Sequence, residues 1–357
     1  MARRYCLPMS FPDYFRVLAV PIVVTVAASC ASPKNDSAMY ELRGSTMGTR
    51  FVVKIVADDD NGMSESALRE LVESELMLVD GLMSQYRPGS ELSQFNRYNE
   101  TTPFAVSDET FEVLAEAHRI SAWTDGAFDI TVGPLVEAWG FGVASEMEPP
   151  SDAEVEELRS RLGFARLRLN VEAHTVQKDE PLLEGDLSAI AKGYAVDRVA
   201  EALELAGFPR YMVEVGGEVR TGGSNDAGTP WRIAVQRPDS HEPSFQMTVP
   251  LTNAAMATSG DYRNFYEWEG RRVSHTIDPR TGRPLEHTLA SVTVVTRWCM
   301  TADAVATALL VLGPEEGYRF AVANDVAALM LVRRADGGFD ELLTPDFERV
   351  LSGEGVR

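Results

Sequence analysis

The sequence predicts an α+β fold in which helices surround a mixed, largely antiparallel sheet core. Apolar residues in the first half of the chain recur mostly at helical spacing. From Arg166 the spacing changes, and Leu167, Leu169 and Val171 alternate with polar residues, as in paired strands. Helix and strand patterns in the second half do not alternate regularly, which argues against a doubly wound parallel sheet.

Composition and charge limit the kinds of partner and function that this chain can have. The chain has 357 residues, of which 45% are hydrophobic and 24% charged, so it can bury a sizeable core, either as one large domain or as two packed lobes. Its formal net charge is −21, and the mean surface field therefore repels polyanions. We expect no nucleic-acid partner.

The N-terminus predicts export. Arg3, Arg4 and Arg16 precede an apolar run over residues 17–28 that is too short to span a bilayer comfortably and ends in small residues. Residues 1–29 are therefore expected to be a signal peptide, which places the mature protein in the bacterial cell envelope.

The three cysteines have different expected roles. Small residues directly before Cys30 are typical of a bacterial lipoprotein cleavage site, so we expect lipidation at Cys30, with cleavage alone as the alternative. Residues 30–39 would then form a lipidated polar tether, with the fold beginning near Tyr40. Cys6 leaves with the signal peptide and Cys30 would carry the lipid, so Cys299 has no disulfide partner and is expected to be a small core residue.

Three helices are expected in the first half. Residues 64–83 carry apolar side chains three and four positions apart, and the hydroxyl of Ser64 can cap this helix. A second helix is expected over residues 107–120. A third opens with Ser151 and Glu154 at capping-box spacing.

The second half predicts interspersed strands and helices. Alternation over residues 167–171 indicates a strand that pairs in a hairpin with one around Val176. Two helices are expected over residues 188–205 and 302–312, ended by Gly207 and by Gly313-Pro314. Further strands are expected at residues 211–221, 231–236, 291–296, 327–332 and 339–343, the last two flanking the turn at 336–338.

Common cofactor signatures are missing from the sequence. It has no Gly-x-x-x-x-Gly-Lys-Ser/Thr loop, no Gly-x-Gly-x-x-Gly after a strand and no Gly-x-Ser-x-Gly elbow. Its five histidines show no zinc-ligand spacing. These absences do not argue against a site for a hard cation such as Mg²⁺.

Asp303 and Thr307 are candidates for such a site. They lie four residues apart on the expected helix 302–312, which places a carboxylate and a hydroxyl on one face near its N-terminus. Mg²⁺ takes few protein oxygens and keeps the rest of its octahedron for water and phosphates. The simpler alternative is an aspartate that complements the helix dipole and a threonine that packs.

Residues 186–193 contain an aspartate, the expected start of a helix and a lysine. Backbone amides and Lys192 could meet a phosphate there, while Asp186 meets a ribose or polar ring. The alternative is a capped amphipathic helix with Lys192 in solvent. Polar side chains also gather on glycine-bounded turns at residues 126–134, 258–262 and 274–282, where binding groups often concentrate.

Taken in order, these blocks resemble the FAD:protein FMN transferases, the ApbE-type flavin transferases also known as thiamine-biosynthesis lipoproteins. The resemblance covers residues 40–352 as one ApbE-like flavin transferase domain. The blocks that carry it are residues 45–49, 83–86, 90–93, 95–96, 126–129, 139–141, 186–194, 215–218, 258–262, 274–282, 302–304 and 307–308.

The resemblance implies a site and a reaction. A threonine hydroxyl of an acceptor protein would attack the FMN-side phosphorus of FAD, releasing AMP and leaving FMN as a phosphoester. His275 is the candidate base for the hydroxyl proton, with a structural histidine beside a turn as the alternative. Magnesium would be held by the Ala189 carbonyl, Asp303 and Thr307. The residues implied to line the FAD site are Met47, Tyr86, Ala127, Phe128, Asp129, Asp186, Lys192 and Ile277.

The resemblance also suggests partners and rival activities. Acceptors would be subunits of membrane redox complexes, and a lipid anchor facing the periplasm would hold the enzyme on the same surface. One rival activity is that of a FAD pyrophosphatase, which gives FMN and AMP when water replaces the threonine. The other is that of a non-catalytic flavin-binding lipoprotein, which needs neither a metal nor a base.

Overall fold

The computed structural model describes residues 38–57, 62–142, 148–238, 244–262 and 264–355, which belong to one compact unit. The expected signal peptide and Cys30 lie outside this described part. Within it, no helix is both long enough and apolar enough to cross a membrane. A chain of this length could form one large domain or two packed lobes, and the described residues form one compact unit.

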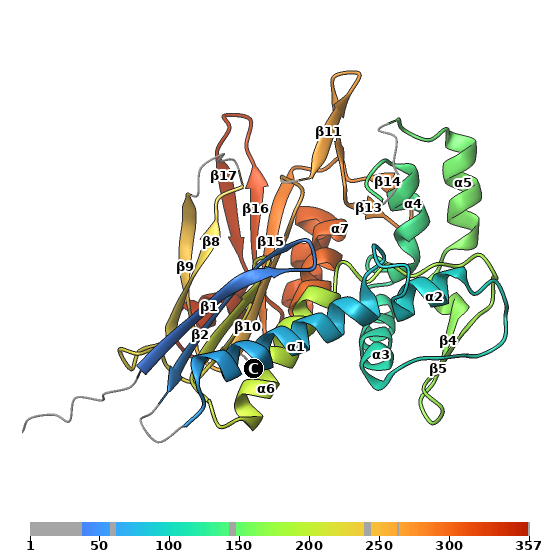
Figure 1. Cartoon of the computed structure of the whole chain (residues 1–357). Coiled ribbons are helices and arrows are strands. Elements are labelled where there is room, and N and C mark those ends of the chain that lie inside the picture. The colour runs from blue at the N-terminus through green and yellow to red at the C-terminus, as the bar shows by residue number, and fades with distance from the viewer. Residues whose placement is uncertain (1–37, 58–61, 143–147, 239–243, 263, 356–357) are drawn as a thin grey trace, which may run out of the picture. The chain divides into compact units, whose positions relative to one another are not determined.

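An eight-stranded sheet forms the centre of the fold (Figure 1). Its strands follow the order β1-β2-β6-β7-β10-β15-β16-β17, and each neighbouring pair is antiparallel. The predicted α+β class with antiparallel pairing is confirmed. The strands of this sheet are β1 Ala38–Thr46, β2 Thr49–Ala57, β6 Tyr211–Val215, β7 Glu218–Gly222, β10 Ala254–Gly260, β15 Leu289–Thr296, β16 Ala327–Arg333 and β17 Phe339–Leu343.

Helices and four small sheets complete the described part. The helices are α1 Glu65–Met83, α2 Glu91–Arg97, α3 Asp108–Trp123, α4 Gly133–Ala138, α5 Asp152–Arg161, α6 Ala191–Leu205, α7 Cys299–Ala323 and α8 Pro345–Leu351, with short 3-10 turns η1 Ile130–Val132 and η2 Phe164–Arg166. The small sheets are β3 Phe104–Ala105 with β5 Thr175–Lys178 and β4 Leu167–Asn170, β8 Trp231–Gln236 with β9 Phe245–Leu251, β11 Phe265–Trp268 with β12 Arg271–Ser274, and β13 Ile277–Asp278 with β14 Arg283–Pro284.

The large sheet is covered on both faces. Successive side chains of a strand point to opposite faces, and on β16 Ala328 and Met330 join the core beneath α1, α6 and α7. Leu329 and Leu331 join a second core with the β8–β9 hairpin and α8. Burial on both faces explains why the late strands read as continuous apolar runs.

Local signals predict several elements well. Ser64, Ser107 and Ser151 each accept a hydrogen bond from a backbone N–H in the first turn of α1, α3 and α5. The hairpin β4–β5 and the pair β16–β17 form as expected. Cys299 is fully buried, as predicted for a core residue.

Several expected boundaries are wrong. Residues 211–221 form two strands, because Gly216 (φ 64°) and Gly217 (φ 111°) turn the chain between β6 and β7. The expected helix at 188–205 begins only at Ala191, since Ile190 has non-helical φ −150°. The helix expected at 302–312 begins at Cys299 and resumes after a break at Gly313 (φ 79°), so Asp303 lies beyond its first turn.

Hydrophobic patterning does not predict the β1–β2 hairpin. Met47 (φ 48°) and Gly48 (φ 70°) form its two-residue turn, a backbone shape that suits the twist of paired strands. Strand β1 begins at Ala38, two residues before the expected start of the fold at Tyr40. Leu42 and alternate residues of β2 then bury against α1.

Helices α6 and α7 meet at very short range, and this contact positions the site described below. A Cβ on Gly193 would lie 2.4 Å from the carbonyl oxygen of Cys299, so only glycine allows this approach. Asp197 of α6 accepts hydrogen bonds from the backbone N–H groups of Cys299 (3.0 Å) and Met300 (2.9 Å). The start of α7 is therefore capped by a residue of α6.

Candidate active site

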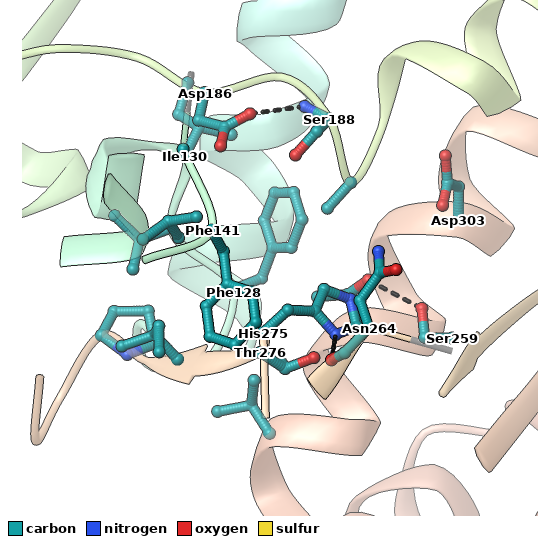
Figure 2. Close-up of a pocket in the computed structure, with 18 of the residues that line it drawn as sticks. Phe128, Ile130, Phe141, Asp186, Ser188, Ser259, Asn264, His275, Thr276 and Asp303 are labelled. Carbon is teal, nitrogen blue, oxygen red and sulfur yellow. Dashed lines mark hydrogen bonds between the residues drawn. The ribbon is translucent and has the colours of Figure 1, made fainter. Parts of the chain in front are cut away.

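A cavity of about 720 Å³ lies where α6, α7 and β10 meet the loops around η1 and the β11–β12 hairpin. Its volume falls in the range of small-molecule and cofactor sites. The walls mix apolar side chains such as Phe128 with carboxylates, hydroxyls and His275 (Figure 2). An elongated polar ligand with an aromatic part suits such a lining.

The loop that holds Phe128 is fixed by Asp129. Its Oδ1 accepts hydrogen bonds from Thr131 N (2.8 Å) and Thr131 Oγ1 (2.7 Å), and its Oδ2 accepts one from Phe164 N (2.8 Å). Burial raises the pKa of Asp129, and these hydrogen bonds oppose that rise. The carboxylate therefore shapes the cavity wall rather than reaching freely into it.

Asp186 begins the segment that leads into α6. Its Oδ1 accepts a hydrogen bond from Ser188 N at 2.8 Å, and its own N–H bonds the Ile130 carbonyl at 2.6 Å (Figure 2). This small turn joins the two loops that form one side of the cavity. It also replaces the first turn of helix expected at Ser188.

Lys192 lies between two buried carboxylates. Its Nζ is 3.2 Å from Glu218 Oε1 and 3.5 Å from Asp303 Oδ2, and it donates to the Ser188 carbonyl at 3.3 Å. Burial alone would lower the pKa of Lys192, but the two carboxylates outweigh it and raise that pKa, so the ammonium stays charged. The alternative of a solvated Lys192 is wrong.

Asp303 and Thr307 face the cavity from one side of α7. Asp303 is 3% exposed, and its Oδ2 accepts a hydrogen bond from Gly193 N at 3.1 Å. Among the described residues, its Oδ1 has no hydrogen-bond donor. The Thr307 hydroxyl pairs with that of Ser259 at 2.8 Å, so oxygen lone pairs remain for a hard cation.

His275 lies at the base of the β11–β12 hairpin. Its backbone N–H and its Nδ1 both bond the Asn264 carbonyl, at 3.1 and 3.0 Å. Because a carbonyl oxygen only accepts, Nδ1 carries the proton in the neutral ring and Nε2 is the basic nitrogen. Burial lowers the pKa of His275 and outweighs the hydrogen bond to Asn264, so the ring is neutral near pH 7. The ring of Phe141 packs edge-on against it at 6.2 Å.

The family model described as the ApbE family matches residues 47–330 of this chain. The chain belongs to the ApbE family. A FAD:protein FMN transferase from Vibrio cholerae is 44% identical over 327 residues, which cover 91% of this chain and 96% of the relative.

Solved structures agree with this membership. The flavin transferase ApbE from Vibrio cholerae has a TM-score of 0.81 at 43% identity and covers 88% of this chain and 100% of that chain. The apo flavinyl transferase ApbE from Pseudomonas stutzeri also has a TM-score of 0.81, at 36% identity, and covers 88% of this chain and 97% of that chain.

This ApbE-family chain brings almost all the predicted site residues together. Tyr86 is exposed at the cavity wall, whereas Ala127, Phe128 and Ile277 are nearly buried in it. Met47 is absent from the described lining and packs against the core beside the turn of β1–β2. The predicted residues that do line the cavity are Tyr86, Ala127, Phe128, Asp129, Asp186, Ala189, Lys192, His275, Ile277, Asp303 and Thr307.

Sequence reasoning assigned no role to several lining residues. Glu218 is the most important of them, since it is buried and holds Lys192. Its position directly after Gly216-Gly217, in one of the resembling blocks, was the available signal. Ser259 and Asn264, which bond Thr307 and His275, were also missed as partners.

Proposed function

We propose that this chain transfers FMN from FAD to a threonine hydroxyl of an acceptor protein, in a Mg²⁺-dependent reaction that releases AMP. Membership of the ApbE family supports the reaction class. The observation that carries the proposal is one cavity that combines buried oxygen ligands on α7 with a histidine whose basic nitrogen is defined.

His275 would act as the general base. Its Nδ1–H is held by the Asn264 carbonyl, so Nε2 is the nitrogen that can accept the threonine proton. The lowered pKa keeps this nitrogen unprotonated at neutral pH. As the proton moves to Nε2, the threonine oxygen bonds the FMN-side phosphorus and the bond from that phosphorus to the bridging oxygen breaks. AMP leaves with that oxygen.

The residues around Asp303 fit a magnesium ion by the chemistry of their donors. The Ala189 carbonyl, the Asp303 carboxylate and the Thr307 hydroxyl are hard oxygen ligands lining the same cavity. When bound there, the ion would neutralise charge growing on the pyrophosphate. Gly193 N–H and Lys192 hold Asp303 Oδ2, which leaves Oδ1 for the ion.

The proposed setting is the bacterial cell envelope. Export by residues 1–29 and lipidation at Cys30 would anchor the enzyme to a membrane, facing the periplasm. Membrane-bound redox subunits are the acceptors that suit this location. Anchoring would confine enzyme and acceptor to one surface and so raise their encounter rate.

Mass spectrometry tests the proposal. The protein is incubated with FAD, Mg²⁺ and an acceptor domain that carries the target threonine, and a parallel sample contains a chelator. An adduct of FMN mass on threonine, lost on chelation and lost when that threonine is changed to valine, is the expected result. Free FMN with AMP and no adduct would instead favour the pyrophosphatase, and intact FAD would favour a binding protein.

A further inference from the structure

Glu218 has a buried carboxylate oxygen with no partner. The residue is 4% exposed and lines the cavity at the first position of β7. Oε1 pairs with Lys192 Nζ at 3.2 Å, whereas Oε2 is buried and has no hydrogen-bond partner in the described part of the chain. An unpaired buried carboxylate oxygen is costly, so this atom calls for a ligand.

The backbone holds Glu218 firmly in place. The turn Gly216-Gly217 precedes it, and Glu218 pairs with Val215 across the β6–β7 hairpin. A Cβ on Gly216 would lie 2.9 Å from Thr49 Cγ2 of β2, so the turn is packed tightly against the neighbouring hairpin. The same Cβ position is 3.4 Å from Glu218 Oε2, so this buried oxygen lies beside the packed turn.

Lys192 cannot satisfy the second oxygen. An ammonium has three N–H donors, and those of Lys192 face Ser188 O, Glu218 Oε1 and Asp303 Oδ2. Two carboxylates around one ammonium leave a net negative charge in a buried place. A cation or a polarised donor beside Oε2 would balance it.

We propose that Glu218 is a positioning residue of the magnesium site, whose Oε2 accepts a hydrogen bond from a water molecule bound to the ion. Oε1 meanwhile pairs with Lys192. The Lys192 ammonium lies between Glu218 and Asp303, which is the proposed magnesium ligand. Because Mg²⁺ retains several waters when few protein oxygens bind it, such a partner for its hydration shell is chemically suitable. The inference rests on the proposed magnesium dependence.

Metal titration of the full-length protein without substrate tests this role. Mn²⁺ replaces Mg²⁺ as the probe, and electron paramagnetic resonance reports free Mn²⁺. Glu218→Gln keeps the shape of the side chain but removes its charge, and we expect its dissociation constant for Mn²⁺ to rise about 10-fold or more. Glu218→Asp keeps the charge but withdraws the oxygens, and should also bind Mn²⁺ more weakly.

Glu214→Gln is the matched control. Glu214 lies on the same hairpin, outside the cavity lining, and its Oε1 accepts a hydrogen bond from Gly217 N at 2.9 Å. This variant removes the same charge and perturbs the same turn, yet should leave Mn²⁺ affinity unchanged. If Glu214→Gln weakens Mn²⁺ binding as much as Glu218→Gln does, the proposed role of Glu218 is refuted. Thermal unfolding confirms that each variant is folded.

Asp303→Asn separates the two proposals. If Asp303→Asn loses Mn²⁺ binding while Glu218→Gln keeps the parental affinity, the metal site stands and the role of Glu218 is refuted. If neither change affects binding, the assignment of the metal to Asp303 fails and the role of Glu218 fails with it. Weakening by both changes, with the control unaffected, supports both.

Discussion

Replacing Gly193 with alanine should separate α6 from α7. The added Cβ would lie 2.4 Å from the Cys299 carbonyl oxygen, 2.7 Å from its carbon and 2.8 Å from Met300 Cα, all of them backbone atoms. Ordinary contacts need about 3.5 Å, so the helices must move apart by about 1 Å. The hydrogen bond from Gly193 N to Asp303 Oδ2, now 3.1 Å, would lengthen with them.

Two opposing contributions set the effect of Gly193→Ala on the free energy of unfolding. Overpacking against backbone costs about 1–3 kcal/mol, and alanine returns about 1 kcal/mol through its better helix propensity. We therefore expect the free energy of unfolding to fall by up to about 2 kcal/mol. Because a displacement of about 1 Å in a positioned group costs on the order of 100-fold in rate, kcat should fall much more than stability suggests.

Urea unfolding and the rate of FMN transfer measure these effects. Gly81→Ala is the control, because Gly81 also lies inside a helix, α1, but a Cβ there meets nothing within 4 Å. It should raise the free energy of unfolding by about 0.5–1 kcal/mol and leave kcat unchanged. If Gly193→Ala were likewise stabilising and fully active, the proposed dependence of the site on this helix contact would be wrong.

Four further predictions concern three side chains of the cavity. His275→Asn should lower kcat at least about 100-fold while FAD still binds, as fluorescence titration can show. In the parent protein with Mg²⁺ saturating, so that the ion keeps Glu218 ionised, activity should fall with acid only below pH 6.5, since burial lowers the pKa of His275 and the base works unprotonated; an acid limb above pH 6.5 in kcat/KM would contradict this. Asp303→Asn should abolish FMN transfer at any Mg²⁺ concentration, tested by the mass-spectrometric assay. Asp129→Asn should reduce the free energy of unfolding by about 1–3 kcal/mol, because an amide cannot accept from both Thr131 and Phe164; equal urea midpoints would refute it.

Sequence predicts those parts of the fold that local chemistry decides. A serine hydroxyl caps α1 at Ser64 through a residue three positions away, so its start is readable from a short window. The start of α7 is set instead by Asp197, which is 102 residues from Cys299 in the chain. A window around residue 302 lacks that information, and the expected helix therefore begins three residues late.

The same distinction applies to the site. Asp303 and Thr307 could be proposed as a pair because one helix turn joins them. The meeting of Lys192, Glu218 and Asp303 depends on the contact of α6 with α7 and on the β6–β7 turn, neither of which hydrophobic spacing reveals. The family resemblance supplied most of the site residues predicted from the sequence, but it did not show that the Asp129 carboxylate is hydrogen-bonded within its own loop region.

The charge of the cavity gives an independent reason to expect a cation there. Among its described lining residues, Asp129, Asp186, Glu218 and Asp303 are acidic, whereas Lys192 is basic and already paired. Burial raises the pKa of Glu218 to about 7, so this group can shed part of its charge, but the balance stays negative. A pyrophosphate entering such a cavity would meet repulsion from each unpaired carboxylate. A divalent ion held by Asp303 would reverse that local sign and so make an acidic cavity compatible with an anionic substrate.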